Sequence, residues 1–296
     1  MALLVGVTIL WSFSFSLIGV YLAGQVDSYF AVLTRVTLAC LLFLPMLRPR
    51  RVPVSIRWAL MGIGAIQLGL MYISYYYSFV LLSVPEILLF TIFTPIYIAL
   101  IDDLLAGRFR PFYLVTAGLA VLGAAVIRYQ GISDDYWFGF AMVQGANLCF
   151  AIGQVGYRRL MLRTQLDVPA VNLFGWFYIG ALLLVLPAWL IWGDASRPAT
   201  TPLQWGVLLW LGLVASGLGY FLWNEGARRV DAGTLAIMNN ALIPAGLLVN
   251  LVIWDHDADL LRIGVGGAIM LASLVFNRWW QRRYPGTAKQ EANAIG

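Results

Sequence analysis

The sequence predicts an all-α integral membrane protein with ten transmembrane helices, arranged as two inverted repeats of five. Hydrophobic residues make up 61% of the 296 residues and charged residues only 11%, whereas soluble domains carry about 25% charge. So few charges indicate that lipid surrounds most of the surface. Because a spanning helix needs about 20 apolar residues, the length accommodates roughly ten helices with short loops. The alternation of basic loops predicts the sidedness of the helices, and a proline at corresponding points of the two halves predicts the repeat.

Breaks at charged, polar and Gly/Pro-rich positions divide the chain into segments of spanning length. The first segment lacks the basic start and the cleavage site of a secretory signal, so we expect a retained helix. The third and fourth have the weakest boundary, because only residues 81–85 separate them. Charged loops mark most other boundaries, at 48–57, 108–110, 134–135, 158–163, 228–229 and 255–257. In chain order, the predicted helices are 2–22, 28–47, 57–79, 84–103, 111–127, 137–157, 170–192, 203–223, 232–254 and 259–280.

The basic residues predict which side each loop occupies. Of the 19 Lys and Arg residues, 15 lie in loops after even-numbered helices or in the C-terminal segment, and only Arg128, Arg197 and Arg262 lie on the other side. Short cytoplasmic loops are enriched in Lys and Arg. We therefore expect both termini in the cytoplasm and a multi-pass protein of the bacterial cytoplasmic (inner) membrane.

The two halves of the chain resemble each other. Pro95 lies midway along the fourth predicted helix and Pro244 midway along the ninth, about half the chain apart. Because each half has an odd number of helices, two tandem halves must enter the membrane from opposite sides, an arrangement typical of transporters. The predicted domains are residues 1–130 and 131–281, each a five-helix repeat, followed by a polar cytoplasmic tail at 282–296.

These features resemble the drug/metabolite transporter superfamily, EamA-type: ten short helices, very short loops, and a proline in helices four and nine. The resemblance covers residues 1–280. The aromatic-rich profile, with Trp11-Ser12-Phe13-Ser14-Phe15 in the first helix, is similar to that of bacterial aromatic amino acid exporters of the YddG type. The resemblance implies an exporter with a central cavity lined mainly by helices one, three, four, six, eight and nine.

Polar residues inside spanning helices are costly, so they tend to face the bundle interior or a water-filled path. Helical spacing shows which of them share a face. Several predicted faces combine amides and hydroxyls with aromatic rings, which suit a ring-bearing or apolar solute. The candidate cavity residues are Ser12, Ser16, Tyr72, Tyr76, Phe79, Phe90, Tyr97, Asn147, Gln154, Trp176, Asn224, Asn239 and Asn240.

Some of these positions have an alternative interpretation. Small residues in membrane helices often mediate close packing, so the face that carries Ser12 and Ser16 serves either the cavity or a helix contact. Tyr75, Tyr76 and Tyr77 span too wide an arc for all three to line a cavity, so at least one is expected at the membrane interface.

The two prolines are candidate hinges. Proline cannot donate to the carbonyl four residues earlier, which here belongs to Thr91 and Asn240. A free carbonyl at membrane depth is tolerated only beside protein or a watery cavity. We expect Pro95 and Pro244 to act as hinges or to face the substrate. The alternative is a kink that only improves packing.

Charge is nearly absent from the spans. Arg35, in the second predicted helix, is the one embedded cation, and three roles stay open: its side chain snorkels to the interface, pairs with Asp27, or faces an anionic group. No mid-membrane carboxylate suggests a proton relay. No clustered nucleophile, base or metal ligands are evident, so we expect neither an enzyme nor a metal or other cofactor.

The predicted function is export of amino acids, with aromatic or large apolar side chains, by alternating access around a central cavity. The expected partners are this small-molecule substrate and the lipid bilayer. No nucleic acid is expected, and a monomer is the simplest assembly. The alternative cargo is another metabolite or a drug, such as an amine or a sugar. A membrane-embedded enzyme is a weaker alternative.

Overall fold

The computed structural model describes residues 2–105, 107, 134–164, 168–227, 229 and 232–254, with the isolated positions 261, 264, 265, 268, 272, 275 and 279. Throughout these residues the regular elements are helices. Seven helical segments of the described chain are long and apolar enough to cross a membrane, and Met238–Ile253 is a shorter apolar helix. The fifth predicted span, most of the tenth and the tail at 282–296 lie outside the described residues. The ten-helix count and the division into inverted repeats therefore stay predictions.

The first half contains four described spans. The first two are α1 (Ala2–Tyr21) and α2 (Ser28–Phe43), and α2 is followed by the 3₁₀ turns η1 (Leu44–Met46) and η2 (Pro49–Arg51). The third span is α3 (Val54–Gly64), the π-helical segment η3 (Ala65–Leu70) and α4 (Met71–Leu81). The fourth is α5 (Val84–Phe90), the 3₁₀ turn η4 (Thr91–Phe93) and α6 (Thr94–Leu105).

A capping box sets the weak boundary between the third and fourth spans. The Ser83 backbone N–H and hydroxyl both donate to Glu86 Oε2, at 2.8 Å each. This pairing satisfies groups that a helix N-terminus otherwise leaves open. The acidic Glu86 is therefore a start signal for α5.

The second half contains four described spans. They are α8 (Asp134–Thr164), α9 (Val171–Trp192), a composite span, and α12 (Ala232–Ile253). The composite span consists of α10 (Pro202–Leu209), the π-helical segment η5 (Trp210–Gly219) and α11 (Tyr220–Ala227). A second capping box, between Thr201 and Gln204, starts α10.

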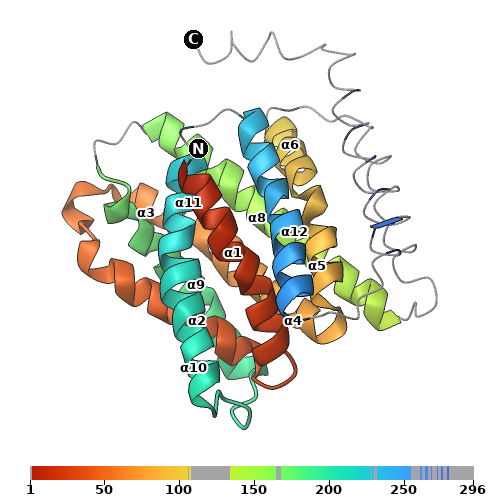
Figure 1. Cartoon of the computed structure of the whole chain (residues 1–296). Coiled ribbons are helices and arrows are strands. Elements are labelled where there is room, and N and C mark those ends of the chain that lie inside the picture. Colours follow the sequence, from red (N-terminus) through yellow and green to blue (C-terminus); the bar gives the residue numbers. More distant parts are fainter. Residues whose placement is uncertain are drawn as a thin grey trace.

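The helices run side by side in one bundle, in which α1 lies between α11 and α12 (Figure 1). α9 packs against α2 and α3, while α8 packs against α4 and α6. The α3–α9 crossing depends on glycine, because a Cβ at Gly64 would overlap the Phe177 carbonyl and one at Gly180 would overlap the Met61 carbonyl. Apolar side chains such as Leu183 and Leu190 are exposed, whereas polar ones such as Gln67 and Asn147 are buried. This distribution suits a lipid environment.

Loops that the basic-residue pattern assigned to the same side also meet in the structure. At one end, Asp27 N–H donates to Arg197 O at 2.8 Å, and Gln204 Nε2 donates to Gln25 Oε1 at 3.2 Å. At the other end, Arg159 forms an ion pair with Asp102, with Nη2 and Oδ1 2.7 Å apart. Which of these ends is cytoplasmic stays a prediction.

Candidate substrate-binding cavity

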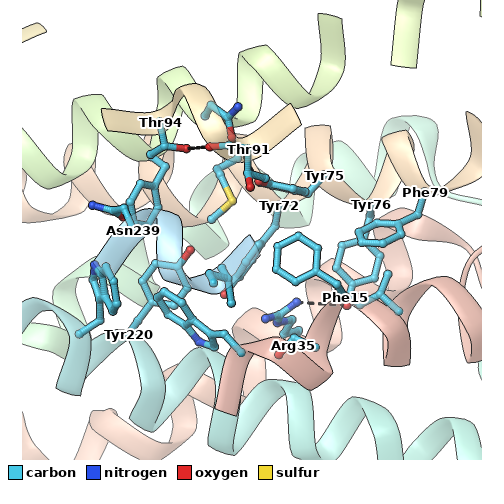
Figure 2. Close-up of a pocket in the computed structure, with 18 residues that line it drawn as sticks. Phe15, Arg35, Tyr72, Tyr75, Tyr76, Phe79, Thr91, Thr94, Tyr220 and Asn239 are labelled. Atoms are coloured by element: carbon cyan, nitrogen blue, oxygen red, sulfur yellow. Dashed lines mark hydrogen bonds between the residues drawn. The ribbon is translucent and has the colours of Figure 1, made fainter. Parts of the chain in front are cut away.

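A cavity lies among α1, α2, α4, η4, α6, α8, α11 and α12 (Figure 2). Aromatic rings form most of its wall, and amides, hydroxyls and one guanidinium supply the polar groups. No carboxylate is among the described residues that line it. The lining residues are Trp11, Ser14, Phe15, Ile18, Arg35, Met71, Tyr72, Tyr75, Tyr76, Phe79, Thr91, Thr94, Asn147, Phe150, Tyr220, Trp223, Asn239 and Leu242.

The aromatic wall is built by contacts between helices. The Trp11 ring centroid lies 4.8 Å from that of Tyr220 and 5.1 Å from that of Trp223, which ties α1 to α11. Phe15 meets Tyr75 edge-on with centroids 6.0 Å apart, which ties α1 to α4. Edge-to-face and tilted arrangements are the favoured geometries of aromatic pairs. The rings therefore fix the cavity wall as well as cover it.

Arg35 is the charged group of the cavity. It is only 4% exposed, and its Nε donates to the Ser216 hydroxyl, while Nη1 lies 3.5 Å from the Tyr76 hydroxyl. Its guanidinium carbon lies 4.2 Å from the centroid of the Tyr72 ring, a cation–π distance. Within the described residues, Arg35 forms no ion pair. Of the three roles left open by the sequence, the structure does not show snorkelling, because the guanidinium is buried and bonded to Ser216. It does not show an ion pair with Asp27 either, whose carboxylate caps α2 by accepting from Phe30 N–H at 2.8 Å.

The π-helical segment η5 presents Ser216 to Arg35. Ser216 Oγ also hydrogen-bonds the Tyr72 hydroxyl, at 2.8 Å. Two aromatic residues hold the segment through its carbonyls: Trp11 Nε1 donates to Ala215 O at 2.9 Å, and the Tyr178 hydroxyl donates to Ser216 O at 2.6 Å. π-Helical turns often occur at functional sites, and this one positions a hydroxyl beside the buried cation.

Amide groups lie on another side of the cavity. Asn147 Nδ2 donates to the Phe90 carbonyl at 2.9 Å, and its Oδ1 accepts from the Tyr75 hydroxyl at 3.2 Å. In Figure 2, Thr91 and Thr94 lie across the cavity from Arg35, and Asn239 projects from α12. The cavity therefore has a cationic side and a neutral polar side, with rings between them.

Five predicted site residues line this cavity, and they come from three different spans. The others lie elsewhere, although most of them are buried. Those that line the cavity are Tyr72, Tyr76, Phe79, Asn147 and Asn239.

Two predicted residues of α1 belong to the packing alternative. The Ser12 hydroxyl donates to Ile9 O at 2.6 Å, within its own helix. Ser16 Oγ accepts from Asn250 Nδ2 at 3.2 Å, which joins α1 to α12. Gly19, on the same face, lies against Val84. This face of α1 is a helix contact.

In the fourth and sixth spans, the predicted residues Phe90, Tyr97 and Gln154 are not among the lining residues. The Phe90 ring packs edge-on against Phe140, with centroids 4.9 Å apart. The Tyr97 hydroxyl donates to Gln144 Oε1 at 3.1 Å. Gln154 is buried, and both polar atoms of its amide have no hydrogen-bond partner in the described part of the chain.

The remaining three predicted residues also lie outside the lining. The Arg57 guanidinium lies over the Trp176 ring, with its central carbon 5.4 Å from the ring centroid. Asn224 Nδ2 donates to Tyr220 O at 2.9 Å, so it supports a cavity residue from behind. Asn240 is half-buried beside Asn239. Of the three consecutive tyrosines, Tyr75 and Tyr76 line the cavity, while Tyr77 is 40% exposed, as expected for at least one of them.

The carbonyl near Pro95 is arranged differently from the prediction. Thr91 O is not free, because the Thr94 N–H and the Thr94 hydroxyl both donate to it, the hydroxyl at 2.7 Å. The 3₁₀ turn η4 makes this bonding possible. The carbonyl held by side chains of α8 is that of Phe90, one residue earlier. Pro244 lies inside α12, and hinge motion at either proline stays a proposal.

The sequence did not indicate cavity positions for Trp11, Phe15, Trp223 or Arg35. In α1, Trp11, Phe15 and Ile18 share a face by helical spacing, next to the small polar face that carries Ser12 and Ser16. The usable signal was the aromatic character of that adjacent face. Beside the amides, hydroxyls and rings that the sequence predicted, a guanidinium also lies in the wall.

Apolar helices that enclose a buried polar and aromatic cavity define a multi-pass membrane protein with an internal binding site. The chain belongs to the EamA-like transporter family, whose model matches residues 1–129 and 137–279. This finding confirms the predicted superfamily. A crystal structure that is 20% identical superposes with a TM-score of 0.64 over 92% of this chain and 94% of that chain, which supports the fold.

Several relatives are much more similar in sequence. A protein of Pseudomonas aeruginosa named "Probable biotin transporter" is 55% identical over 95% of this chain and 99% of its own length. Proteins of Salmonella typhimurium and Escherichia coli, each named "Biotin transporter", are 52% identical over 95% of this chain and 93% of their own length. These names do not support the expected likeness to aromatic amino acid exporters. They agree better with the alternative of another metabolite.

Proposed function

We propose that this protein carries biotin across the bacterial cytoplasmic membrane. The observation that carries the proposal is identity of 52–55% with relatives named for biotin, over 95% of the chain. Similarity of this extent includes all the spans that surround the cavity. The earlier prediction of amino acid export has no comparable support.

The chemistry of the cavity is compatible with this cargo. Biotin has a fused ureido ring with N–H donors and a carbonyl acceptor, and a valerate chain that ends in a carboxylate. Amide and hydroxyl groups of Asn147, Asn239 and Thr91 can exchange hydrogen bonds with a ureido group. The rings of Trp11, Phe15 and Tyr75 suit the apolar body of the ligand.

Transport in this proposal proceeds by alternating access. The two halves would rock about the cavity, with Pro95 and Pro244 as hinges, so that the ligand faces one side of the membrane at a time. Cavities of this kind lie at the interface between repeats. Here α1, α2 and α4 of the first half face α8, α11 and α12 of the second.

Uptake of radiolabelled biotin tests the proposal. Biotin-auxotrophic cells whose own transporter is deleted should take up labelled biotin when this protein is produced. Liposomes with the purified protein should show counterflow when preloaded with unlabelled biotin. Phenylalanine, tryptophan and leucine serve as competitors. Absence of biotin counterflow, together with counterflow of an amino acid, would contradict the proposal and support the prediction of an amino acid exporter.

A further inference from the structure

We infer that Arg35 is the binding site for the carboxylate of the transported molecule, and that the cavity therefore selects monocarboxylates over neutral analogues. The inference deepens the proposed function and relies on it for the choice of biotin as the ligand. It begins from the burial of a cation, since a charged side chain inside a membrane protein is costly and tends to have a functional partner.

The surroundings of Arg35 stabilise its charge without neutralising it. Ser216 accepts from Nε, and the Tyr72 ring lies 4.2 Å from the guanidinium carbon. The Tyr76 ring centroid lies 5.9 Å away. Hydroxyl oxygens and ring faces are attracted to a cation but carry no net negative charge. Within the described residues, no carboxylate contacts Arg35, so its positive charge is unbalanced.

Arg35 also has donors to spare. A guanidinium carries more N–H groups than the bonds to Ser216 and Tyr76 occupy. The group lines the cavity, and Figure 2 shows it among the cavity side chains, below Phe15 and Tyr76. Planar guanidinium and carboxylate groups pair through two parallel N–H···O bonds. A ligand carboxylate in the cavity would therefore supply both the missing charge and the missing acceptors.

The position of Arg35 is rigidly supported. α2 packs closely on η5, because a Cβ at Gly212 would lie 2.7 Å from Leu38 Cδ1 and one at Gly217 would lie 2.9 Å from Leu42 Cδ2. Leu38 and Leu42 share a face of α2 with Arg35 by helical spacing. This packing places Arg35 next to Ser216. A preorganised guanidinium loses less entropy on binding than a mobile one.

The arrangement also orients the ligand. With its carboxylate at Arg35, the ligand can extend past Tyr72 and Tyr75 toward Thr91, on the neutral polar side (Figure 2). For biotin, this direction places the ureido ring near the amides and the valerate chain between rings. Biotin analogues with a blocked carboxylate are then poor ligands.

Matched ligand pairs test the inference. Binding of biotin and of biotin carboxamide to the purified protein is measured from the thermal unfolding shift across ligand concentrations, with competition against labelled biotin uptake as a second assay. The wild-type protein should bind biotin at least about tenfold more tightly than the carboxamide. We call this fold difference in affinity, biotin over its carboxamide, the affinity ratio. In Arg35→Gln the affinity ratio should fall below about twofold through loss of biotin affinity, because the charge-assisted bonds are gone.

Two further variants separate recognition from folding. Arg35→Lys keeps the charge but not the planar fork, so its ratio should be intermediate, and it serves as the test if Arg35→Gln does not accumulate. Arg48→Gln makes the same chemical change at an exposed loop position and should keep the wild-type ratio. The inference would be overturned if the affinity ratio of the wild-type protein were near one, or if both Arg35 variants kept the ratio of the wild-type protein. Neither result would contradict the proposal that the protein transports biotin.

A second pair, phenylpropionate and phenylpropionamide, keeps the two proposals distinguishable. If the protein neither binds nor transports biotin, the proposed function fails. An Arg35-dependent preference for phenylpropionate over its amide would then still support the carboxylate site. Without preference for either acid over its amide, the inference is wrong.

Discussion

At the scale of single residues, Ser216 connects the cation of the cavity to its aromatic wall. Its hydroxyl accepts from Arg35 Nε and hydrogen-bonds the Tyr72 hydroxyl at 2.8 Å. Ser216 thus acts through Arg35, as a positioning residue. The side chain is fully buried, so alanine at this position leaves Arg35 Nε without its acceptor and lets the guanidinium turn.

We predict that Ser216→Ala raises the KM for transport about five- to tenfold, with a smaller change in kcat, because ligand binding loses an oriented donor while the moving helices stay intact. Initial uptake rates across substrate concentrations measure both constants. Ser74→Ala is the matched control, since Ser74 is half-buried, lies outside the cavity lining, and its hydroxyl donates to Leu70 O of its own helix span. Equal loss of kcat and unchanged KM would contradict a positioning role.

Asn147 has two roles, because it joins neighbouring helices and also lines the cavity. Its amide holds the Phe90 carbonyl and the Tyr75 hydroxyl, and it also lines the cavity. The sequence predicted a lining position for this residue, because polar groups inside membrane helices tend to face the bundle interior. The partners themselves come from α4 and α5, far away in the chain.

At the scale of elements, the crossing of α3 and α9 depends on two glycines. A Cβ at Gly180 would overlap the backbone carbonyl of Met61, and one at Gly64 would overlap that of Phe177. Backbone atoms cannot move aside as a flexible side chain can. The two helices must therefore separate to accommodate any larger residue.

Gly180→Ala should lower the midpoint of thermal unfolding in detergent by several degrees, because the α3–α9 contact opens. Gly62→Ala is the control within α3: nothing lies within 4 Å of its Cβ position, and alanine favours helix over glycine by about 1 kcal/mol. We expect Gly62→Ala to leave the midpoint unchanged or to raise it. Tryptophan fluorescence during heating measures both, and equal midpoints for the two variants would contradict the packing argument.

The fourth span is interrupted by the 3₁₀ turn η4, which ends two residues before Pro95. If Pro95 acts as a hinge, Pro95→Ala should restore a helical donor, stiffen the span and lower kcat about tenfold or more, with ligand affinity little changed. Pro187→Ala, at an exposed proline inside α9, is the matched control and should transport normally. Normal transport by Pro95→Ala would refute the hinge.

At the scale of the whole molecule, both ends of the bundle are tied across distant loops. Arg197 Nη2 donates to Gly24 O at one end, and Arg159 pairs with Asp102 at the other. The distribution of basic residues predicts that the Arg159 end is cytoplasmic. Both native cysteines, Cys40 and Cys149, are buried, which favours labelling experiments.

We predict that a membrane-impermeant maleimide labels Ser196→Cys in intact cells but labels Arg50→Cys only after permeabilisation. Both positions are exposed, and both variants are made in a background of Cys40→Ser and Cys149→Ser. The extent of modification is read from a mass shift on a gel. The reverse pattern would show that the positive-inside assignment is inverted.

The sequence by itself determined that lipid surrounds this chain, where most helices begin and end, and that polar groups lie inside the bundle. These properties follow from local composition and from capping residues such as Ser83 and Glu86. Helical spacing also grouped residues by face, as in α1.

Only the tertiary structure decided which face meets the cavity. In α1, Ser16 faces α12 while Trp11 and Phe15 face the cavity. The rotation of a helix about its axis depends on its neighbours. Small polar residues and aromatic residues can lie against lipid, in a cavity or at a helix contact, so residue type alone does not fix that rotation. For the same reason the role of Arg35 was open in the sequence. Ser216 lies 181 positions away in the chain, and only folding brings it to Arg35, which forms no ion pair in the part of the chain that the structure describes.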